Sequence, residues 1–307
     1  GLVGSEMCIR DSYCIQLNTY RGKFIIKEMV GFTGWNLFAG LAMIGRNQGV
    51  AVIINIFLGT IANAAYGVAN QINGALGHFS ATFQKAINPQ LMKSEGMNDR
   101  NRLFRISFIS SKFSVLALAF FAVPFIMEMN EVLTLWLKDD IPPFTLKLAQ
   151  YILLLSITYQ YSVGIMAAIQ ATGKIRNYQI IMGSLLLMNV PIAYFILKMG
   201  YSVYYTTIAF VILELISLCV RLFMANKLTG MSVKEYIQNV IQPTMIIIVI
   251  PVIVAMIPHF VMSNSFLKLV IVCSIYCLLF AVLMFRFAFD EGQREHIKSK
   301  IQHLLKR

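Results

Sequence analysis

Charged residues are scarce in this 307-residue sequence, and acidic residues are the scarcest. Lys, Arg, Asp and Glu together make up 13% of the chain, and only 14 residues are acidic. The sequence has no phosphate-binding loop ending in Gly-Lys-Ser/Thr, no HExxH, no GxSxG and no pair of carboxylates in a polar segment. We therefore expect a protein that is not an enzyme, with no catalytic residues and no cofactor.

Cysteine and histidine are also too few and too scattered for a disulfide framework or a metal site. Cys219, Cys273 and Cys277 lie inside apolar runs, and Cys8 and Cys14 belong to the leading segment. None of these spacings matches a zinc motif, and histidines are not clustered near them. We predict reduced, buried thiols and no bound metal.

What the sequence has in abundance is apolar residues. The chain is 58% hydrophobic with a mean hydropathy of +0.69. Apolar runs of about 20 residues recur along it, as expected of membrane-spanning helices, and short alternating strand patterns are not seen. The net charge of +12 resides in basic residues between these runs, which favours anionic lipid over nucleic acid as the partner. The fold class is thus an all-α polytopic membrane protein.

We expect about eight transmembrane helices. Their approximate ranges are 29–59, 61–92, 103–127, 146–172, 178–198, 203–226, 240–262 and 266–289. The first two are longer than the hydrocarbon core requires and should tilt or extend into the cytoplasm.

Both ends of the sequence differ from the apolar part between them. Residues 1–12 resemble the translation of a sequencing adapter, and we exclude them from fold reasoning. Because no initiator Met precedes them, we expect a fragment that lacks its N-terminal part. Residues 13–28 indicate a basic cytoplasmic loop, and residues 290–307 indicate a basic cytoplasmic tail.

Lys and Arg residues are concentrated in alternate loops. The loops predicted on the side of the membrane that is poorer in basic residues carry Lys138, Lys147, Lys198 and Lys268. The richer set includes Lys174 and Arg221 as well as the segments on either side of residue 100. Since cytoplasmic loops are enriched in basic residues, both ends of the chain are expected in the cytoplasm.

Arg46 is the exception, because it lies midway along the first predicted span. A guanidinium group at the bilayer centre costs about 2.5–3.5 kcal/mol on insertion scales, so it usually faces a cavity or a partner. Its fork of N–H donors matches phosphate oxygens, which favours anion binding. The alternative is a structural pair with an acid or with backbone carbonyls, and Glu214 is the one acid well inside a span. Gln48 follows closely and is placed on the same face.

The second predicted span has a polar stripe of small and amide residues. Its members are Asn63, Gly67, Asn70, Gly74, Gly77, Ala81, Gln84 and Asn88. They follow steps of three and four residues and so share one side of a helix. Glycines on such a face allow close helix packing, whereas Asn70, Asn73 and Gln84 suggest the wall of a wet cavity. His78 and Glu214 are candidates for proton or ion coupling, with satisfied packing residues as the alternative.

Several stretches together resemble a known family. They are GWNLFAGLAMIGRNQGVAVIINIFLG, NAAYGVANQINGALGHFSATFQKAINPQLMKS, QATGKIRNYQI and CVRLFMANKL. These stretches resemble bacterial lipid-linked oligosaccharide flippases, the Wzx-like polysaccharide exporters of the multidrug and polysaccharide (MATE-like) exporter superfamily. The resemblance covers residues 20–289.

The resemblance implies a two-lobe bundle of about twelve to fourteen helices around a central cavity. Residues 29–229 would form the six-helix C-terminal lobe, and residues 230–289 two additional helices. The family carries undecaprenyl-pyrophosphate-linked sugars across the bacterial inner membrane for O-antigen, lipopolysaccharide or capsule biosynthesis, beside other polysaccharide-assembly proteins.

On this basis Arg46 is predicted to hold the pyrophosphate. Gln48, Asn70, Asn73 and Gln84 are predicted to line the sugar path. Two alternatives stay open: a cation-coupled multidrug exporter of the same superfamily, and a non-transporting membrane scaffold.

Overall fold

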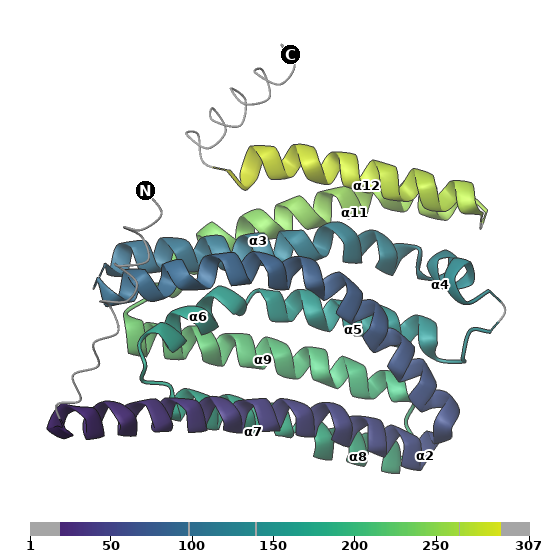
Figure 1. The fold of residues 1–307 in the computed structure, drawn as a ribbon. Helices are drawn as coiled ribbons and strands as arrows, with labels where there is room; N and C mark the ends of the chain where they lie inside the picture. Colours follow the sequence, from purple (N-terminus) through teal and green to yellow (C-terminus); the bar gives the residue numbers. More distant parts are fainter. Residues whose placement is uncertain (1–18, 98, 139, 264, 290–307) are drawn as a thin grey trace, which may run out of the picture.

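The computed structural model describes residues 19–289 except 98, 139 and 264, and every regular element in this part of the chain is helical (Figure 1). The elements are α2 (Thr19–Gly96), α3 (Arg100–Met127), α4 (Met129–Leu137), α5 (Thr145–Gln160), α6 (Val163–Ala171), α7 (Arg176–Leu187), α8 (Asn189–Lys198), α9 (Val203–Thr229), α10 (Val233–Tyr236), a π-helical turn (Ile237–Ile241), α11 (Gln242–Val261) and α12 (Phe266–Phe287). The predicted artefact at residues 1–12 and the predicted tail at residues 290–307 lie outside the described residues.

The helices confirm an all-α protein that is embedded in a membrane. Six helical segments of the described residues are long and apolar enough to cross a bilayer, and a seventh is obtained if α5 and α6 are counted as one bent span. One of the six runs from Met29 to Gly96 over 68 residues. A straight helix of that length would extend about 100 Å, three times the hydrocarbon thickness, so it cannot be a single pass.

Helix α2 is broken at Gly59, where the chain turns back (Figure 1). The backbone angles there are φ 78° and ψ −177°, a conformation that is essentially restricted to glycine. We call residues 19–58 the first arm and residues 60–96 the second arm. The break lies at the boundary predicted between the first two spans.

The first arm begins earlier than expected. Helix α2 starts at Thr19, so residues 19–28 are helical rather than the predicted loop. No proline interrupts residues 19–58, and a helix that has nucleated in the apolar part propagates into the polar flank at little cost.

Helix α3 is at the centre of the bundle and packs closely through small residues. Ser107, Ser110, Ser111 and Ser114 are fully buried along one side of it. The Ser111 hydroxyl accepts a hydrogen bond from the Gly164 backbone N–H of α6 at 3.0 Å. A Cβ atom at Gly164 would lie 2.0 Å from the Ser107 carbonyl oxygen, so only glycine permits this approach.

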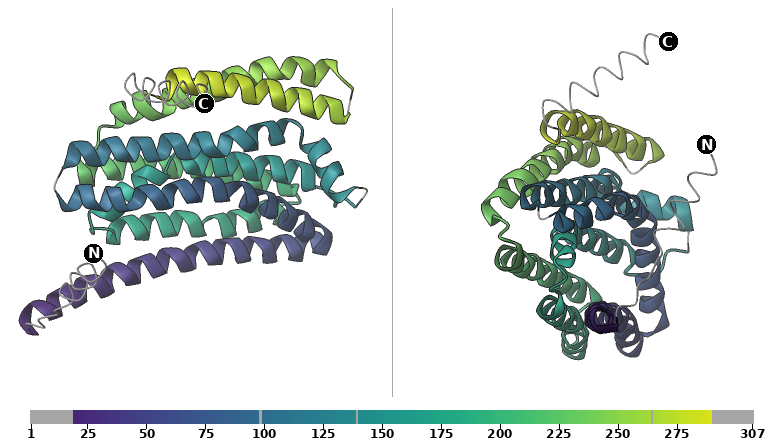
Figure 2. Two further views of the ribbon diagram at one scale, coloured as in Figure 1. Left: turned by 45° about the horizontal axis from the view of Figure 1, so that its top comes forward. Right: turned by 60° about the vertical axis from the view of Figure 1, so that its left-hand side comes forward.

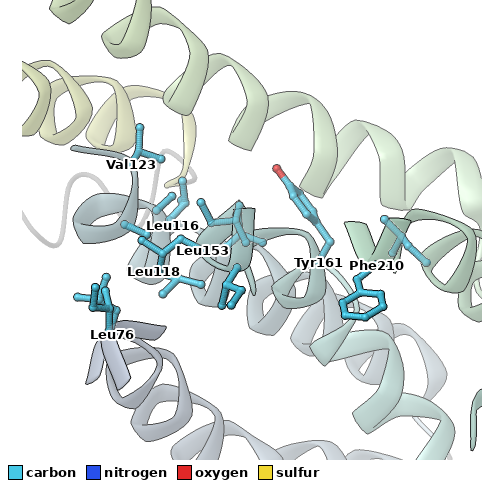
Figure 3. Packing of buried hydrophobic residues seen from close by; sticks show 14 of the residues in the cluster. Leu76, Leu116, Leu118, Val123, Leu153, Tyr161 and Phe210 are labelled. Carbon is cyan, nitrogen blue, oxygen red and sulfur yellow. The ribbon is translucent and has the colours of Figure 1, made fainter. Parts of the chain in front are cut away.

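The apolar core extends from the second arm through α3 and α5 to α9 (Figure 3). Leu76, Leu116, Leu153 and Phe210 are all buried in it. Tyr161 lies where α5 ends, and its hydroxyl points away from this core toward the C-terminal helices (Figure 3). It forms a hydrogen bond with the Thr244 hydroxyl at 3.0 Å.

The span predicted at residues 146–172 is two helices, α5 and α6, bent by 40°. At the bend the Ser162 backbone N–H donates to the Tyr159 carbonyl three residues earlier, in place of the usual partner four residues earlier. The Tyr161 carbonyl accepts a hydrogen bond from the Tyr236 hydroxyl of α10. A backbone group that the bend frees inside the bilayer is thereby satisfied by a side chain.

Helices α11 and α12 form a hairpin on the outer side of α3, at the edge opposite the first arm of α2 (Figure 2). Glu128, which is fully buried between α3 and α4, links this hairpin to the bundle. Its carboxylate lies 2.7 Å from His259 Nδ1 of α11 and 3.5 Å from Lys268 Nζ of α12. Lys268, which was predicted in a loop, is therefore buried beside an acid instead.

The contact between α3 and α6 gives a test of the packing. We expect Gly164→Ala to lower stability by about 2 kcal/mol or more, because overpacking a close helix contact forces the helices apart. The apparent Tm in detergent should fall by several degrees. Gly67→Ala is the matched control, because a Cβ atom there meets nothing within 4 Å. An unchanged Tm for Gly164→Ala would contradict the close approach.

Candidate functional site

A cavity of about 500 Å³ lies between both arms of α2 and helices α5, α6, α7 and α9. Its size is within the range of small-molecule sites. The polar residues that line it are Asn36, Arg46, Tyr66, Asn70, Asn73, Ser156, Tyr159, Gln160, Gln170, Tyr178, Gln179, Glu214 and Arg221. Apolar side chains such as Met43, Ile152 and Phe210 fill the spaces between them. We call this feature the central cavity.

Arg46 lies on the first arm of α2 and is half-buried against the central cavity. Its Nε donates a hydrogen bond to Oδ1 of the adjacent Asn47 at 3.1 Å. Among the described residues no Asp or Glu forms an ion pair with it. A structural ion pair of Arg46 with Glu214, one form of the alternative role, is therefore not formed, and Arg46 lines the cavity without a fixed acidic counterion in this part of the chain.

Glu214 pairs with a different arginine. Both Glu214 and Arg221 are on α9, each is 6% exposed, and their side chains form an ion pair. The prediction that Arg221 belongs to a cytoplasmic loop is wrong. Arg221 can be buried in the bundle because Glu214, two turns earlier on α9, compensates its charge. A count of basic residues along the sequence does not reveal this pairing.

The guanidinium group of Arg221 has several further neighbours. Nη1 donates a hydrogen bond to the Ser162 hydroxyl at 2.8 Å, at the bend between α5 and α6. The guanidinium carbon lies 5.6 Å from the centre of the Tyr159 ring, a distance typical of a cation–π contact. Tyr159 is also within electrostatic reach of Arg46 and Glu214. Arg46, Glu214 and Arg221 are therefore charged groups of the same cavity that Tyr159 lines.

Amide side chains line the central cavity and also connect its helices. Gln179 Nε2 of α7 donates to Asn36 Oδ1 of the first arm at 3.0 Å. Gln84 Nε2 of the second arm donates to Gln160 Oε1 of α5 at 3.0 Å. Asn73, on the second arm, forms a hydrogen bond with the Ser156 hydroxyl of α5. These pairs position the walls, because an amide inside the bilayer needs a partner.

The predicted sugar-path residues are only partly brought together. Asn70 and Asn73 line the cavity directly, whereas Gln84 reaches it through its bond to Gln160. Asn70 Nδ2 donates to the Tyr66 carbonyl one turn earlier at 2.8 Å. Gln48 is exposed and lies outside the lining, which corrects its placement. Side chains two positions apart on an α-helix point in directions that differ by about 200° in rotation around the axis, so Gln48 points away from Arg46.

His78 is also separated from the central cavity. It lies beside a second, mainly apolar groove of about 640 Å³, with Phe79 and Phe83 of the second arm and aromatic residues of α3 and α12. Of the two residues predicted for coupling, Glu214 therefore lines the cavity and His78 does not.

Sequence reasoning did not select Arg221, Asn36, Ser156 or Gln179. One signal for Arg221 was present, since the residues around it from Val211 to Phe223 are apolar apart from Glu214 and Ser217. A lone basic residue inside such a run, seven positions from an acid on the same helix, indicates a buried pair. Asn36 and Gln179 have no comparable local signal, because their contact joins positions 143 residues apart.

The Glu214–Arg221 pair predicts a specific stability pattern. Glu214→Gln leaves a guanidinium charge buried without its counterion, and we expect a loss of about 3 kcal/mol. The double variant Glu214→Gln/Arg221→Met should recover most of this loss, because it removes both charges. Apparent Tm values in detergent for the two single variants and the double variant form a thermodynamic cycle. Additive effects would show that the two side chains do not interact.

Comparisons with protein-family models, with curated proteins and with solved structures find no match to this chain. Within the described residues, no group of three or more His, Cys, Asp and Glu side chains is placed to hold a metal ion. The functional assignment therefore depends on the chemistry of the central cavity.

Proposed function

We propose that this chain is part of a transporter that flips an anionic, lipid-linked oligosaccharide across the bacterial inner membrane, as Wzx-like flippases do. The observation that carries the proposal is Arg46, a cation in the membrane-embedded part that faces a polar cavity and has no acidic partner among the described residues. A cation at this depth is unfavourable unless it faces a cavity or a partner of opposite charge, and an anionic substrate would supply that charge.

The chemistry of the cavity walls agrees with a substrate that has both charge and hydroxyl groups. The Arg46 guanidinium presents parallel N–H donors that suit phosphate oxygens. Amide side chains can donate to and accept from sugar hydroxyls, and six of them line the cavity. These six are Asn36, Asn70, Asn73, Gln160, Gln170 and Gln179.

The proposed topology has about eight passes, with each arm of α2 crossing the bilayer once. Helices α2 to α9 then form the lobe that carries the site, and the segment from α10 to α12 adds two passes. We further propose that a second lobe closes the cavity and that rocking of the two lobes gives alternating access. The excess of Lys and Arg in alternate segments between the passes supports an orientation with both ends of the chain in the cytoplasm.

The alternative of a cation-coupled drug exporter is less well supported. That mechanism needs a membrane acid that can exchange its cation for the drug. Within the described residues Glu214 is the acid that lines the cavity, and it is already neutralised by Arg221. A scaffold without transport activity is also less well supported, because six amide side chains line the cavity and a purely structural interior does not require a polar cavity.

Arg46 is the residue to test. Arg46→Ala should lower the flipping rate of a fluorescent lipid-linked sugar in vesicles about 10- to 100-fold, because a charge-assisted hydrogen bond contributes about 1.5–3 kcal/mol. Arg46→Lys should retain part of the rate, since it keeps the charge without the fork. Gln48→Ala, two residues away on the exposed side, is the matched control. A normal rate for Arg46→Ala at normal membrane abundance would refute this role.

The topology can be tested separately. In a variant without native cysteines, Asp140→Cys and Lys174→Cys place one thiol in each of two exposed loops. A membrane-impermeant maleimide applied from the periplasmic side should label position 140 and leave position 174 unlabelled until the membrane is disrupted. Labelling of position 174 in intact cells would reverse the proposed orientation.

A further inference from the structure

The central cavity holds two guanidinium groups, Arg46 and Arg221, that reach it from different helices. Arg46 lies on the first arm of α2, and Arg221 lies on α9. Tyr159 lines the cavity with both of them, and its ring centre lies 5.6 Å from the guanidinium carbon of Arg221. Two fixed cations around one small cavity are suited to a ligand that carries more than one negative charge.

Arg221 is more deeply buried than Arg46 and has unused hydrogen-bonding capacity. Nη1 provides its bonds to Glu214 and Ser162. Nε is buried and has no hydrogen-bond partner within the described residues. A buried N–H donor without a partner is costly, and a guanidinium group can offer five donors in all. Arg221, which lines the cavity, therefore has at least one N–H donor that the described residues leave unpaired.

Glu214 occupies the place that an anionic ligand would take at Arg221. We propose that Glu214 is a built-in competitor: a phosphate-type anion of the substrate displaces its carboxylate from Arg221 and is then held between Arg221 and Arg46. This inference rests on the proposed function and adds a second ligand, Arg221, and a regulating acid, Glu214, to that site. The ligand class is a multivalent phosphate group such as a pyrophosphate.

The geometry of the pair allows this exchange without a change in the backbone. Residues seven apart on a helix are separated by about 10 Å along its axis, so both side chains must extend along α9 to meet. Rotation of side-chain torsions alone is enough to separate them. Tyr159 and Tyr178 line the same cavity as Glu214, and their hydroxyl groups are the hydrogen-bond donors that we propose for the displaced carboxylate.

The charges of the cavity determine the direction of the effect. Its charged lining residues are Arg46, Arg221 and Glu214, so the described residues give it a net charge of +1. If Glu214 competes with the ligand, removing its charge strengthens anion binding. If Glu214 instead positions Arg221 for the ligand, removing its charge weakens binding. The two roles therefore predict changes of opposite sign in one measurement.

The experiment measures binding of inorganic pyrophosphate to the purified protein in detergent, by calorimetry and by the ligand-induced rise in apparent Tm. We expect Glu214→Gln to bind pyrophosphate about tenfold more tightly than the unmodified chain, within the usual range of coupling between sites. Pyrophosphate should also restore much of the stability that this variant loses. Arg221→Gln and Arg46→Ala should each bind more weakly, and Gln48→Ala should bind normally.

A second variant keeps the test decisive if Glu214→Gln does not fold. Glu214→Asp retains a buried acid but is one methylene shorter and reaches Arg221 less well across two turns. It should bind pyrophosphate with an affinity between those of the unmodified chain and Glu214→Gln. Equal or weaker binding by the variants of Glu214, or no pyrophosphate binding by any variant, would overturn the proposal.

The outcome also separates this inference from the proposed function. If Arg46→Ala abolishes flipping while Glu214→Gln binds pyrophosphate no more tightly, the flippase function stands and the competitor role of Glu214 fails. If Glu214→Gln binds more tightly while Arg46→Ala flips the lipid normally, the anion site stands and the assigned substrate fails.

Discussion

The absence of water inside a bilayer is the constraint on which this structure depends. A polar group there must find its partner within the protein, and the described part of the chain largely follows this rule. Glu214 pairs with Arg221, and Glu128 lies between His259 and Lys268. Three amide contacts join helices around the central cavity. Arg46 differs from these groups, because its side-chain hydrogen bond within the described residues is to the neighbouring Asn47 and it lines the central cavity.

The two interruptions of helical structure produce the cavity. At Gly59 the chain turns back, so that the two arms of α2 form two of its walls. At the 40° bend between α5 and α6, the Ser162 hydroxyl group accepts a hydrogen bond from Arg221. The same bend frees the carbonyl of Tyr161, which Tyr236 satisfies from α10. The C-terminal helices therefore support the bend that positions one side of the candidate site.

The sequence allowed prediction of those features that depend on local pattern. Long apolar runs located the helices, and the boundary between the first two predicted spans fell at the break. Helical spacing placed Asn73 on the polar side that contains Asn70. Features that depend on how helices rotate and pair were not accessible. Gln48 was grouped with Arg46 by proximity along the chain, although helical geometry directs it outward. Arg221 was assigned to a loop because a basic residue near the end of a span usually belongs to one, and its burial depends on Glu214.

A transporter must bind its substrate firmly enough to collect it and weakly enough to release it. A cavity with two free guanidinium groups would hold a pyrophosphate too tightly for the second requirement. In the proposed exchange, Glu214 makes release of the anion easier, because its carboxylate returns to Arg221 as the anion leaves. The energy lost when the anion departs is then partly recovered by the ion pair. In this proposal the buried pair on α9 serves release as Arg46 serves capture, although the sequence draws attention first to Arg46.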